Sequence, residues 1–444
     1  MISFSEGQEI ELKGVIVQFR IFSGERKYYL KNADATFTFR TRDSFNPGDV
    51  ISLNGVVENI SDFSIIPKKI NLLSGKEVYS EIEAGIMEKT EIKLSNALPA
   101  LKEPMEKVAK KLIAAKELNR YIMLRFHGDA DGIAGALVLR KILRFRGYQQ
   151  NSAVYSPREA VNDIGTLNHE NRPILILLDF GANTESIDGL KLLNAAGIET
   201  IIIDHHPFDK KVKEYSKTVL TPWDVDGLED PSKYTAGYLS AEIANMCGAE
   251  NASDYAKIAC AGDKSNVAEP GEKDRKTALV LDYLAAHAAF GNSLDFYADV
   301  LKKEELYSSI YSQASEKISE ALERALPKIK KIEKNGITVY VIPLDGVVEP
   351  KVFPNRSKVT TAVFEHFRTD SPMVAIGFGK RTVIMRANDA FIKRGLSFPD
   401  IIKKVSSDMK DFVMAGGGHA KAAAVRVEEG YEKSVVDRLI EEFK

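Results

Sequence analysis

Short apolar runs that alternate with helical patterns constrain the fold most strongly, and they lie between residues 120 and 270. Tyr121–Phe126, Ile174–Leu178 and Thr200–Ile203 are runs of strand length, whereas apolar residues recur at helical spacing over Ile133–Phe145. Strands that are apolar throughout are buried on both faces, as in a parallel sheet covered by helices. The sequence therefore predicts an α/β domain built on a mainly parallel sheet.

The residues on either side of this domain predict four further parts. Residues 1–75 hold short segments with strand alternation, which is typical of a small all-β barrel such as the oligonucleotide-binding (OB) fold. Residues 76–118 and 271–335 have helical spacing, and we interpret the basic stretch Lys328–Lys334 as a solvated helix end. In order, the predicted parts are an OB-like β-barrel domain (1–75), a helical connector (76–118), the parallel-sheet domain (119–270), a helical linker (271–335) and a smaller α/β domain (336–444).

Composition and charge limit the class of protein. The net charge of −2 and the pI near 6.4 argue against a large general affinity for nucleic acid, although they are compatible with a local basic groove. No apolar run approaches the ~20 residues that a membrane span needs, and the N-terminus shows no secretory signal. Cys247 and Cys260 are the only cysteines and make no disulfide framework. We therefore expect a cytoplasmic protein without a membrane partner.

Four polar segments stand where predicted strands or helices end. The segment from His127 to Asp131 comes directly after the first apolar run, Asp179 follows the second, and Asp204-His205-His206 follows the third. Asp263 comes after a predicted helix. Because ligands of open α/β sheets collect beyond the carboxyl ends of the strands, we expect these groups to converge at one edge of the sheet.

The residue types in these segments indicate a metal site. Asp supplies anionic oxygen and His supplies a neutral nitrogen, a mixture that suits Mn²⁺ or a similar cation better than Ca²⁺. Several carboxylates packed together repel one another unless a cation compensates them. Two cations about 3.5–4 Å apart would neutralise them and stabilise the transition state of phosphate hydrolysis. A single Asp or His segment favours a structural role, so the prediction rests on the combination.

The ordered set resembles the DHH phosphoesterase superfamily. The motifs that carry the resemblance are His127-Gly-Asp-Ala-Asp-Gly132, Asp179, Asp204-His-His206 and Asp263, together with Gly416-Gly-Gly-His419, which is similar to the glycine-rich motif of the family's accessory DHHA1 domain. The resemblance covers about residues 120–430. The length and the N-terminal β domain look closest to archaeal RecJ-like nucleases, including those associated with the GINS replication complex.

The resemblance implies roles for the residues of these motifs. The implied metal ligands are Asp129, Asp131, Asp179, His205 and Asp263, with Asp179 bridging the two cations. Asp204 would orient this neighbourhood or ligate weakly, and His206 would face the substrate phosphate. His127 departs from the pattern, because many relatives place three residues between this His and the first Asp and here only Gly128 intervenes. Either His127 still reaches the first cation or water takes its place. The implied cofactors are two divalent cations, Mn²⁺ in the first place and Mg²⁺ as the alternative.

The C-terminal domain carries candidate phosphate-binding residues. Glycines let backbone N–H groups approach a phosphate closely, so Gly416, Gly417 and Gly418 with the adjacent His419 are interpreted as a phosphate-binding segment, although a tight turn would explain the same glycines. The resemblance adds Arg386, which is similar to an Arg that holds substrate phosphate in the family, although an ordinary surface Arg is the alternative.

The expected activity is a two-metal exonuclease that hydrolyses single-stranded DNA or RNA, in DNA replication or repair. One alternative is a phosphodiesterase for short oligonucleotides or cyclic dinucleotides, and the N-terminal domain argues mildly against it because a short substrate needs no extra platform. An inorganic pyrophosphatase gives no reason for the glycine-rich motif. Another alternative is a replication scaffold that docks on GINS, and the intact Asp and His positions argue against a scaffold that has lost its catalytic function.

Overall fold

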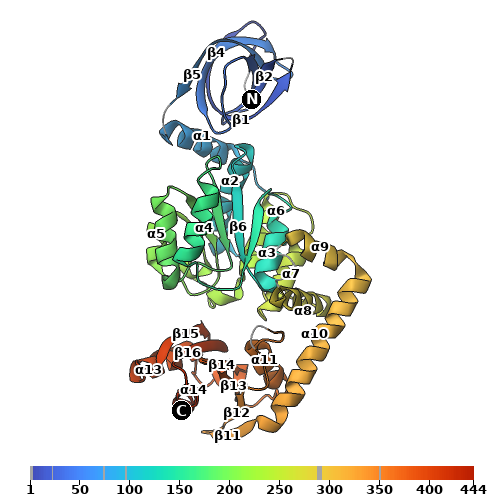
Figure 1. Cartoon of the computed structure of the whole chain (residues 1–444), viewed down its shortest axis with the longest axis vertical. Coiled ribbons are helices and arrows are strands. Elements are labelled where there is room, and N and C mark those ends of the chain that lie inside the picture. Colours follow the sequence, from blue (N-terminus) through green and yellow to red (C-terminus); the bar gives the residue numbers. More distant parts are fainter. Residues whose placement is uncertain (1–3, 23, 74–75, 96–97, 288–292, 350–351) are drawn as a thin grey trace. The chain divides into compact units, whose positions relative to one another are not determined.

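The computed structural model describes residues 4–22, 24–73, 76–95, 98–287, 293–349 and 352–444 (Figure 1). Contacts within the chain form two units, one of Met1–His127 with Asp131–Pro270 and the other of Gly128–Ala130 with Gly271–Lys444. Among the described residues, no helix combines the length and the apolar character that crossing a membrane requires.

The N-terminal strands form a closed barrel in the order β1-β2-β3-β5-β4. Tyr28, Leu30, Phe37, Phe39 and Leu53 point inward and fill its interior, and they alternate with residues on the outer surface. The parallel pair of β3 and β5 closes the barrel. The strands are β1 (Glu9–Phe22), β2 (Glu25–Lys31), β3 (Thr36–Thr41), β4 (Val50–Asn59) and β5 (Ser64–Leu73). The predicted small all-β domain is confirmed.

Two helices, α1 (Lys76–Lys89) and α2 (Pro99–Glu117), follow the barrel. Leu101, Met105 and Leu112 recur at helical spacing on α2 and are buried. Helices therefore occupy the part of the chain for which a helical connector is predicted.

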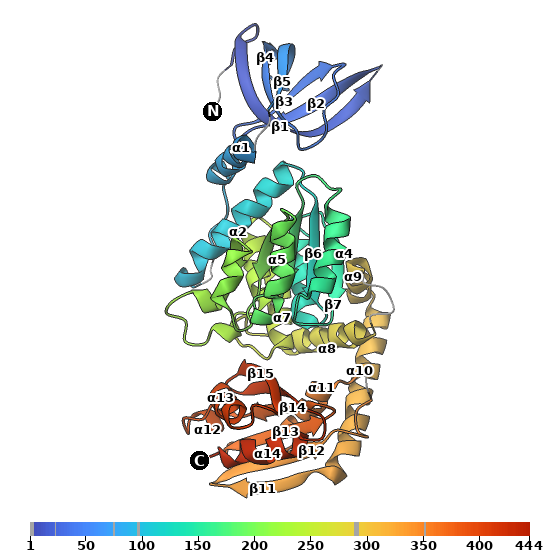
Figure 2. The ribbon, with the colours of Figure 1, turned by 60° about the vertical axis from the view of Figure 1, so that its left-hand side comes forward.

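The central sheet is parallel throughout, in the order β10-β9-β8-β6-β7. Its strand β6 is labelled, with the helices α4 and α5, in Figures 1 and 2. Its strands are β6 (Ile122–His127), β7 (Arg146–Gln150), β8 (Ile174–Leu178), β9 (Glu199–Ile203) and β10 (Thr218–Leu220). Its helices are α3 (Ala130–Leu139), α4 (Pro157–Leu167), α5 (Ile187–Ala195), α6 (Ala236–Met246) and α7 (Ala252–Gly262). Every residue of β8 is buried, as its continuous apolar run predicts.

Helices cover both faces of this sheet. On one face, Leu175 and Leu177 of β8 share a core with residues of α4 and α5, such as Leu167 and Leu190. On the other face, the glycine-lined contact between α3 and α6 lies against Leu178. The predicted parallel sheet with helices on both faces is confirmed. Because the strands are parallel, the carboxyl ends of β6, β8 and β9 lie at one edge of the sheet.

The second unit holds the linker helices and a mixed six-stranded sheet of order β11-β12-β13-β14-β16-β15. The helices are α8 (Glu272–Ala286), α9 (Leu294–Lys302), α10 (Glu304–Ala325), α11 (Arg356–His366), α12 (Asp389–Ile392), α13 (Phe398–Asp408) and α14 (Glu432–Glu441). The strands are β11 (Lys330–Lys334), β12 (Ile337–Pro343), β13 (Met373–Gly379), β14 (Thr382–Ala387), β15 (Val413–His419) and β16 (Ala422–Val427). The predicted smaller α/β domain is confirmed.

Two local features of this unit differ from the sequence interpretation. The prediction of a helix end at Lys328–Lys334 is wrong, because Lys330–Lys334 forms the edge strand β11 paired with β12. Charged side chains are common on edge strands, since they discourage pairing with another chain. The alternative of a tight turn for the glycine-rich run does not hold either, because Gly416–His419 pairs with β16 along β15.

Candidate metal centre

The Asp and His side chains predicted to converge lie at the carboxyl edge of the parallel sheet. His127 ends β6, Asp179 comes directly after β8 and Asp204 comes directly after β9. These three strands are neighbours in the order β9-β8-β6 and run in the same direction. Their ends therefore present side chains from positions up to 77 residues apart in sequence at one place.

Among the described residues, three groups have ligand atoms close enough to share a metal ion. The groups are Asp179 with His205 and His206, Asp131 with His205 and Asp263, and His127 with Asp129 and Asp179, and in each group the ligand atoms lie within 4.8 Å of one another. Asp179 and His205 each belong to two of the groups. All six residues predicted as metal ligands are thus in these groups, together with His206.

His205 is at the centre of the cluster. Its Nε2 lies 3.0 Å from Asp263 Oδ2, 3.4 Å from Asp179 Oδ1 and 3.7 Å from Asp131 Oδ2. Its Nδ1 lies 3.0 Å from the carbonyl oxygen of Ser232, which can accept the Nδ1 proton. Such a bond orients the ring and leaves Nε2 as the ligand atom. The side chain is buried, so solvent does not compete for this position.

The N-terminus of α6 holds Asp131. Its two carboxylate oxygens accept the backbone N–H groups of Ala236 at 2.9 Å and of Gly237 at 2.8 Å. These are unpaired donors of the first helical turn, where a negative charge is favoured. Gly237 has no room for a side chain, since a Cβ there would lie 2.8 Å from Asp131 Oδ1. The helix therefore sets the position of the carboxylate before any cation binds.

Asp179 has an unusual backbone conformation. Its φ of +67° is in the left-handed region, which Asp and Asn tolerate better than most residues. The side chain is 1% exposed, and Oδ2 lies 3.5 Å from His127 Nδ1. Backbone strain of this kind concentrates at functional sites, where the surrounding structure maintains it. Here it turns the chain at the end of β8.

Asp204 supports its neighbours rather than joining a ligand group. One of its oxygens accepts the backbone N–H of Ala182 at 3.0 Å, and the other lies 2.8 Å from His206 Nδ1. Burial raises the pKa of Asp204, but the charge of His206 and these hydrogen bonds outweigh it and lower the pKa to about 2. Asp204 is therefore an anion that orients His206, whose side chain is 35% exposed.

The donor set fits a divalent cation. Burial lowers the pKa of His205, yet the hydrogen bond to Asp263 and the charges of Asp263 and Asp131 raise it to about 10. The carboxylates thus attract a proton onto the ring when no cation is present. The same field attracts a metal ion, and a mixture of carboxylate oxygen and imidazole nitrogen is the ligand chemistry of Mn²⁺ and related ions.

Sequence reasoning missed Asp282, which lies on α8. Its Oδ1 accepts the backbone N–H of Ala130 at 2.9 Å, directly after Asp129, and its Oδ2 pairs with Lys358 of α11. Burial raises the pKa of Asp282, Lys358 opposes this shift and the charge of Asp129 adds to it. No local signal marks this residue, because its partners lie 152 and 76 positions away.

Asp282→Ala is expected to loosen the turn that carries Asp129, because the Ala130 N–H loses its acceptor. Removal of such a supporting group typically costs about 10–100-fold in metal affinity. We expect the Mn²⁺ concentration for half-maximal activity, and the Mn²⁺ dissociation constant from calorimetry, to rise by about tenfold. Glu272→Ala on the same helix is exposed and is the control. Equal metal affinity in the two variants would contradict the role of Asp282.

The predicted phosphate-binding residues lie in the second unit. The Arg386 guanidinium donates to Thr361 Oγ1 at 3.1 Å, to Ser357 Oγ at 2.6 Å and to the Met385 carbonyl at 2.8 Å, so it is held in one orientation. Gly416 and Gly417 are exposed along β15, whereas Gly418 and His419 are half-buried. Their assignment to phosphate binding remains a prediction.

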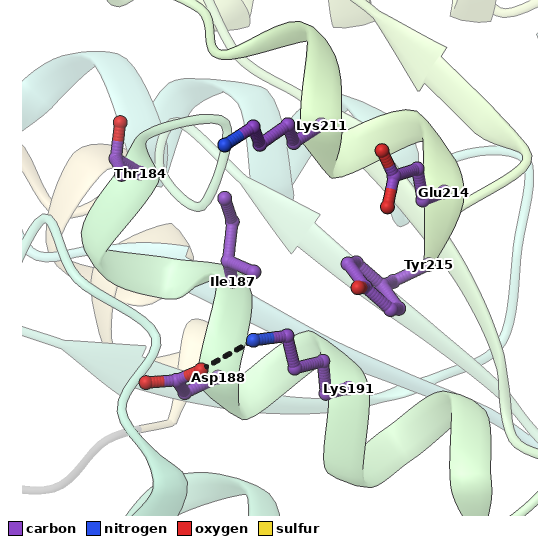
Figure 3. A pocket seen from close by; sticks show the side chains of 7 residues that line it. All are labelled: Thr184, Ile187, Asp188, Lys191, Lys211, Glu214 and Tyr215. Carbon is purple, nitrogen blue, oxygen red and sulfur yellow. Dashed lines mark hydrogen bonds and ion pairs between the residues drawn. The ribbon is translucent and has the colours of Figure 1, made fainter.

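A surface pocket of about 430 Å³ lies elsewhere in the first unit (Figure 3). It is lined by Thr184, Ile187, Asp188, Lys191, Lys211, Glu214 and Tyr215. Asp188 and Lys191 pair at 2.9 Å across one turn of α5. None of the predicted site residues lines this pocket, and its cations are matched by carboxylates, so the Asp and His cluster remains the candidate site.

The domain that holds most of this cluster is similar to a known family. Residues 119–262 match the DHH family, N-terminal domain. An uncharacterised protein of Methanocaldococcus jannaschii is 25% identical over 91% of this chain, and the chain spans 64% of that relative's length.

Two solved structures are similar in fold. One is a DHH domain described as a member of the S1p family of ribosomal proteins, with a TM-score of 0.73, 24% identity and coverage of 82% of this chain and 97% of that chain. The other is RecJ from Thermus thermophilus in complex with Mn²⁺, with a TM-score of 0.50, 15% identity and coverage of 78% and 55%. These similarities support the fold.

Proposed function

We propose that this chain, whose residues 119–262 match the DHH family, N-terminal domain, is a metal-dependent exonuclease that hydrolyses phosphodiester bonds of single-stranded DNA or RNA. The observation that carries the proposal is the cluster at the sheet edge, in which Asp179 and His205 are each shared by two groups of candidate ligands. A pair of closely spaced cations requires shared ligands. Phosphodiester hydrolysis is the chemistry for which such a pair is suited.

The residues divide between two cation positions. Asp179 would be shared by both positions, His127 and Asp129 would hold the first cation with it, and Asp131, His205 and Asp263 would hold the second. When bound, the cations supply positive charge to the phosphate transition state and activate the attacking water. The imidazole ligands favour Mn²⁺, with Mg²⁺ as the alternative, and the similar RecJ of Thermus thermophilus was solved with Mn²⁺.

The other residues of the cluster act on the substrate. His206 is half-buried and Asp204 lies 2.8 Å from its Nδ1, so Nε2 is the ring nitrogen left to contact a phosphate oxygen, to which the imidazolium form can donate a hydrogen bond. Arg386 and the exposed glycines of β15 bind further phosphates of the strand. A single strand several nucleotides long would use these groups, whereas a cyclic dinucleotide would not need them. Docking on a GINS complex stays a prediction of the family resemblance.

The direct test incubates end-labelled single-stranded DNA and RNA with the full chain and Mn²⁺ or Mg²⁺. A ladder that shortens from one end, and that a chelator abolishes, is the expected result. Cleavage of dinucleotides or cyclic dinucleotides with long strands left intact would favour the small-substrate alternative. No hydrolysis of any of these substrates with either metal would overturn the proposal.

Gly417→Val is expected to weaken long-strand binding about tenfold while the hydrolysis of bis(p-nitrophenyl) phosphate changes little, because one charge-assisted hydrogen bond is worth roughly that factor. No atom lies within 4 Å of a Cβ placed at Gly417, so the strand can accept the side chain. Gly418 is unsuitable for this test, since its φ is +138° and a Cβ would lie 2.4 Å from the Ala422 carbonyl oxygen. Met414→Val, an exposed change on the same strand, is the control. If long-strand binding and the hydrolysis of bis(p-nitrophenyl) phosphate fall by the same factor, the glycine-rich strand does not bind the phosphates of the strand selectively.

A further inference from the structure

Trp223 is the only tryptophan of the chain, and it lies at the edge of the central sheet that carries the Asp and His cluster. It belongs to the short 3₁₀ helix η3 (Pro222–Asp224), which begins two residues after the end of β10. β10 pairs with β9 in parallel, and the Asp204 backbone N–H donates to the Leu220 carbonyl at 3.0 Å. The carboxyl ends of β9 and β10 therefore lie side by side, and η3 begins beside the residues that follow β9.

The indole ring of Trp223 is held against the backbone of the cluster. Its Nε1–H donates to the carbonyl oxygen of His205 at 2.7 Å. The Trp223 backbone N–H donates to Thr221 Oγ1 at 3.4 Å, and the next residue, Asp224, forms an ion pair with Lys213. A ring that is fixed before a ligand arrives loses little conformational freedom when the ligand binds.

The fixed ring is also accessible. Trp223 is 38% exposed, although its single polar group is already hydrogen-bonded. One exposed apolar residue is ordinary on a protein surface, so exposure alone assigns no role. Here the ring is anchored to His205, whose Nε2 is at the centre of the cluster, and what remains for a ligand is aromatic carbon. A ligand at the cluster would therefore meet a rigid, planar, apolar surface.

We propose that Trp223 stacks with the base of the nucleotide whose phosphate binds at the cluster. The choice of a nucleotide rests on the proposed function, since hydrolysis of a nucleic-acid phosphodiester brings a base close to the metal centre. Every base has a π-face, so stacking on an aromatic side chain accepts all of them. A base inside a duplex is covered on both faces by its neighbours, so this contact requires an unpaired base. Trp223 thus adds a base-binding residue to a site whose other residues are assigned to metal or phosphate.

Fluorescence of the full chain tests the stacking directly, because all tryptophan emission comes from this one position. The probe is thymidine monophosphate in the presence of Mn²⁺, since it has a base and a phosphate but no phosphodiester bond to cleave. We expect it to quench the emission in a saturable manner, whereas ribose 5-phosphate, which lacks the base, should not. Equal quenching by the two compounds would overturn the proposal, and so would the absence of quenching by both thymidine monophosphate and an oligothymidylate.

Two substitutions separate the ring from its hydrogen bond. Trp223→Phe keeps an aromatic face and Trp223→Leu does not, while both remove the donor to the His205 carbonyl. We expect kcat/KM for an oligothymidylate to fall about tenfold in the Leu variant, as for the loss of one stacked base, and clearly less in the Phe variant. Leu192→Ala removes an apolar side chain of similar exposure from the same domain and is the control. Equal losses in the Phe and Leu variants would assign the effect to the hydrogen bond and not to stacking.

A strand whose terminal residue lacks its base distinguishes stacking from a structural role of the ring. The abasic residue is placed at the end from which the labelled strand shortens. Trp223→Leu should have little further effect on this strand, because the partner of the ring is already missing and the two changes are not additive. The same loss on the normal and the abasic strand would show that Trp223 only supports the backbone of His205.

Two outcomes separate this inference from the proposed nuclease activity. If thymidine monophosphate quenches the emission and ribose 5-phosphate does not, but the chain hydrolyses no phosphodiester, the stacking position stands and the nuclease does not. If the parent chain degrades strands but neither the emission nor the Trp223 variants respond to the base, the nuclease stands and the stacking position does not.

Discussion

Asp179→Asn is expected to reduce phosphodiester hydrolysis by about a thousandfold or more while the chain remains folded. Its carboxylate belongs to two of the candidate ligand groups, so its loss affects both cation positions. Loss of several kcal/mol of charge stabilisation in the transition state corresponds to a factor of this size. Asn is preferable to Ala at this position, because the φ of +67° suits Asn better and the isosteric amide leaves no cavity.

Two measurements check this expectation. Initial rates with Mn²⁺ give the loss of activity, and thermal melting with and without Mn²⁺ gives metal binding independently of turnover. A ligand at one hundred times its dissociation constant stabilises a protein by about 2.7 kcal/mol, so the parent chain should melt higher with Mn²⁺ and the variant should not. Asp188→Asn, an exposed carboxylate of the same domain, is the control. Near-normal activity in a folded Asp179→Asn chain would refute the metal centre.

His205→Ala and His206→Ala are expected to affect different properties, Mn²⁺ binding in the first variant and turnover in the second. His205 is buried with Nε2 within 3.0–3.7 Å of three carboxylates, so its removal should abolish most Mn²⁺ binding and activity together. His206 is half-exposed and hydrogen-bonded to Asp204, so its removal should leave metal binding largely intact and lower turnover.

Metal content after dialysis and calorimetric titration with Mn²⁺ distinguish the two variants. His169→Ala is the control, since His169 is exposed and outside the cluster. Equal loss of metal in the His205 and His206 variants would show that both rings are ligands, which the group of Asp179, His205 and His206 makes geometrically accessible. The proposed role of His206 at the phosphate would then be wrong.

Three of the five strands of the central sheet, β6, β8 and β9, could be predicted closely from sequence, whereas β7 and β10 were not predicted. Ile174–Leu178 was expected as a strand and is one, and β6 and β9 lie within one residue of their predicted bounds. The reason is that a strand buried on both faces must be apolar at every position, and this signal is local. Weaker local signals were ambiguous. The glycines of Gly416–Gly418 favour a turn by propensity, but in the fold they are part of β15 and pair with β16.

The sequence by itself determined which side chains are available for the site and which strand end each of them follows. The motif residues at the ends of β6, β8 and β9 follow from apolar periodicity and from the rule that parallel strands end at one edge. Only the tertiary structure decided how these groups are shared: His205 between two ligand groups, Asp131 at the start of α6, and Asp282 behind Asp129. The physical reason is that periodicity reports the surroundings of one segment, whereas distances between segments far apart in sequence depend on how all the layers pack.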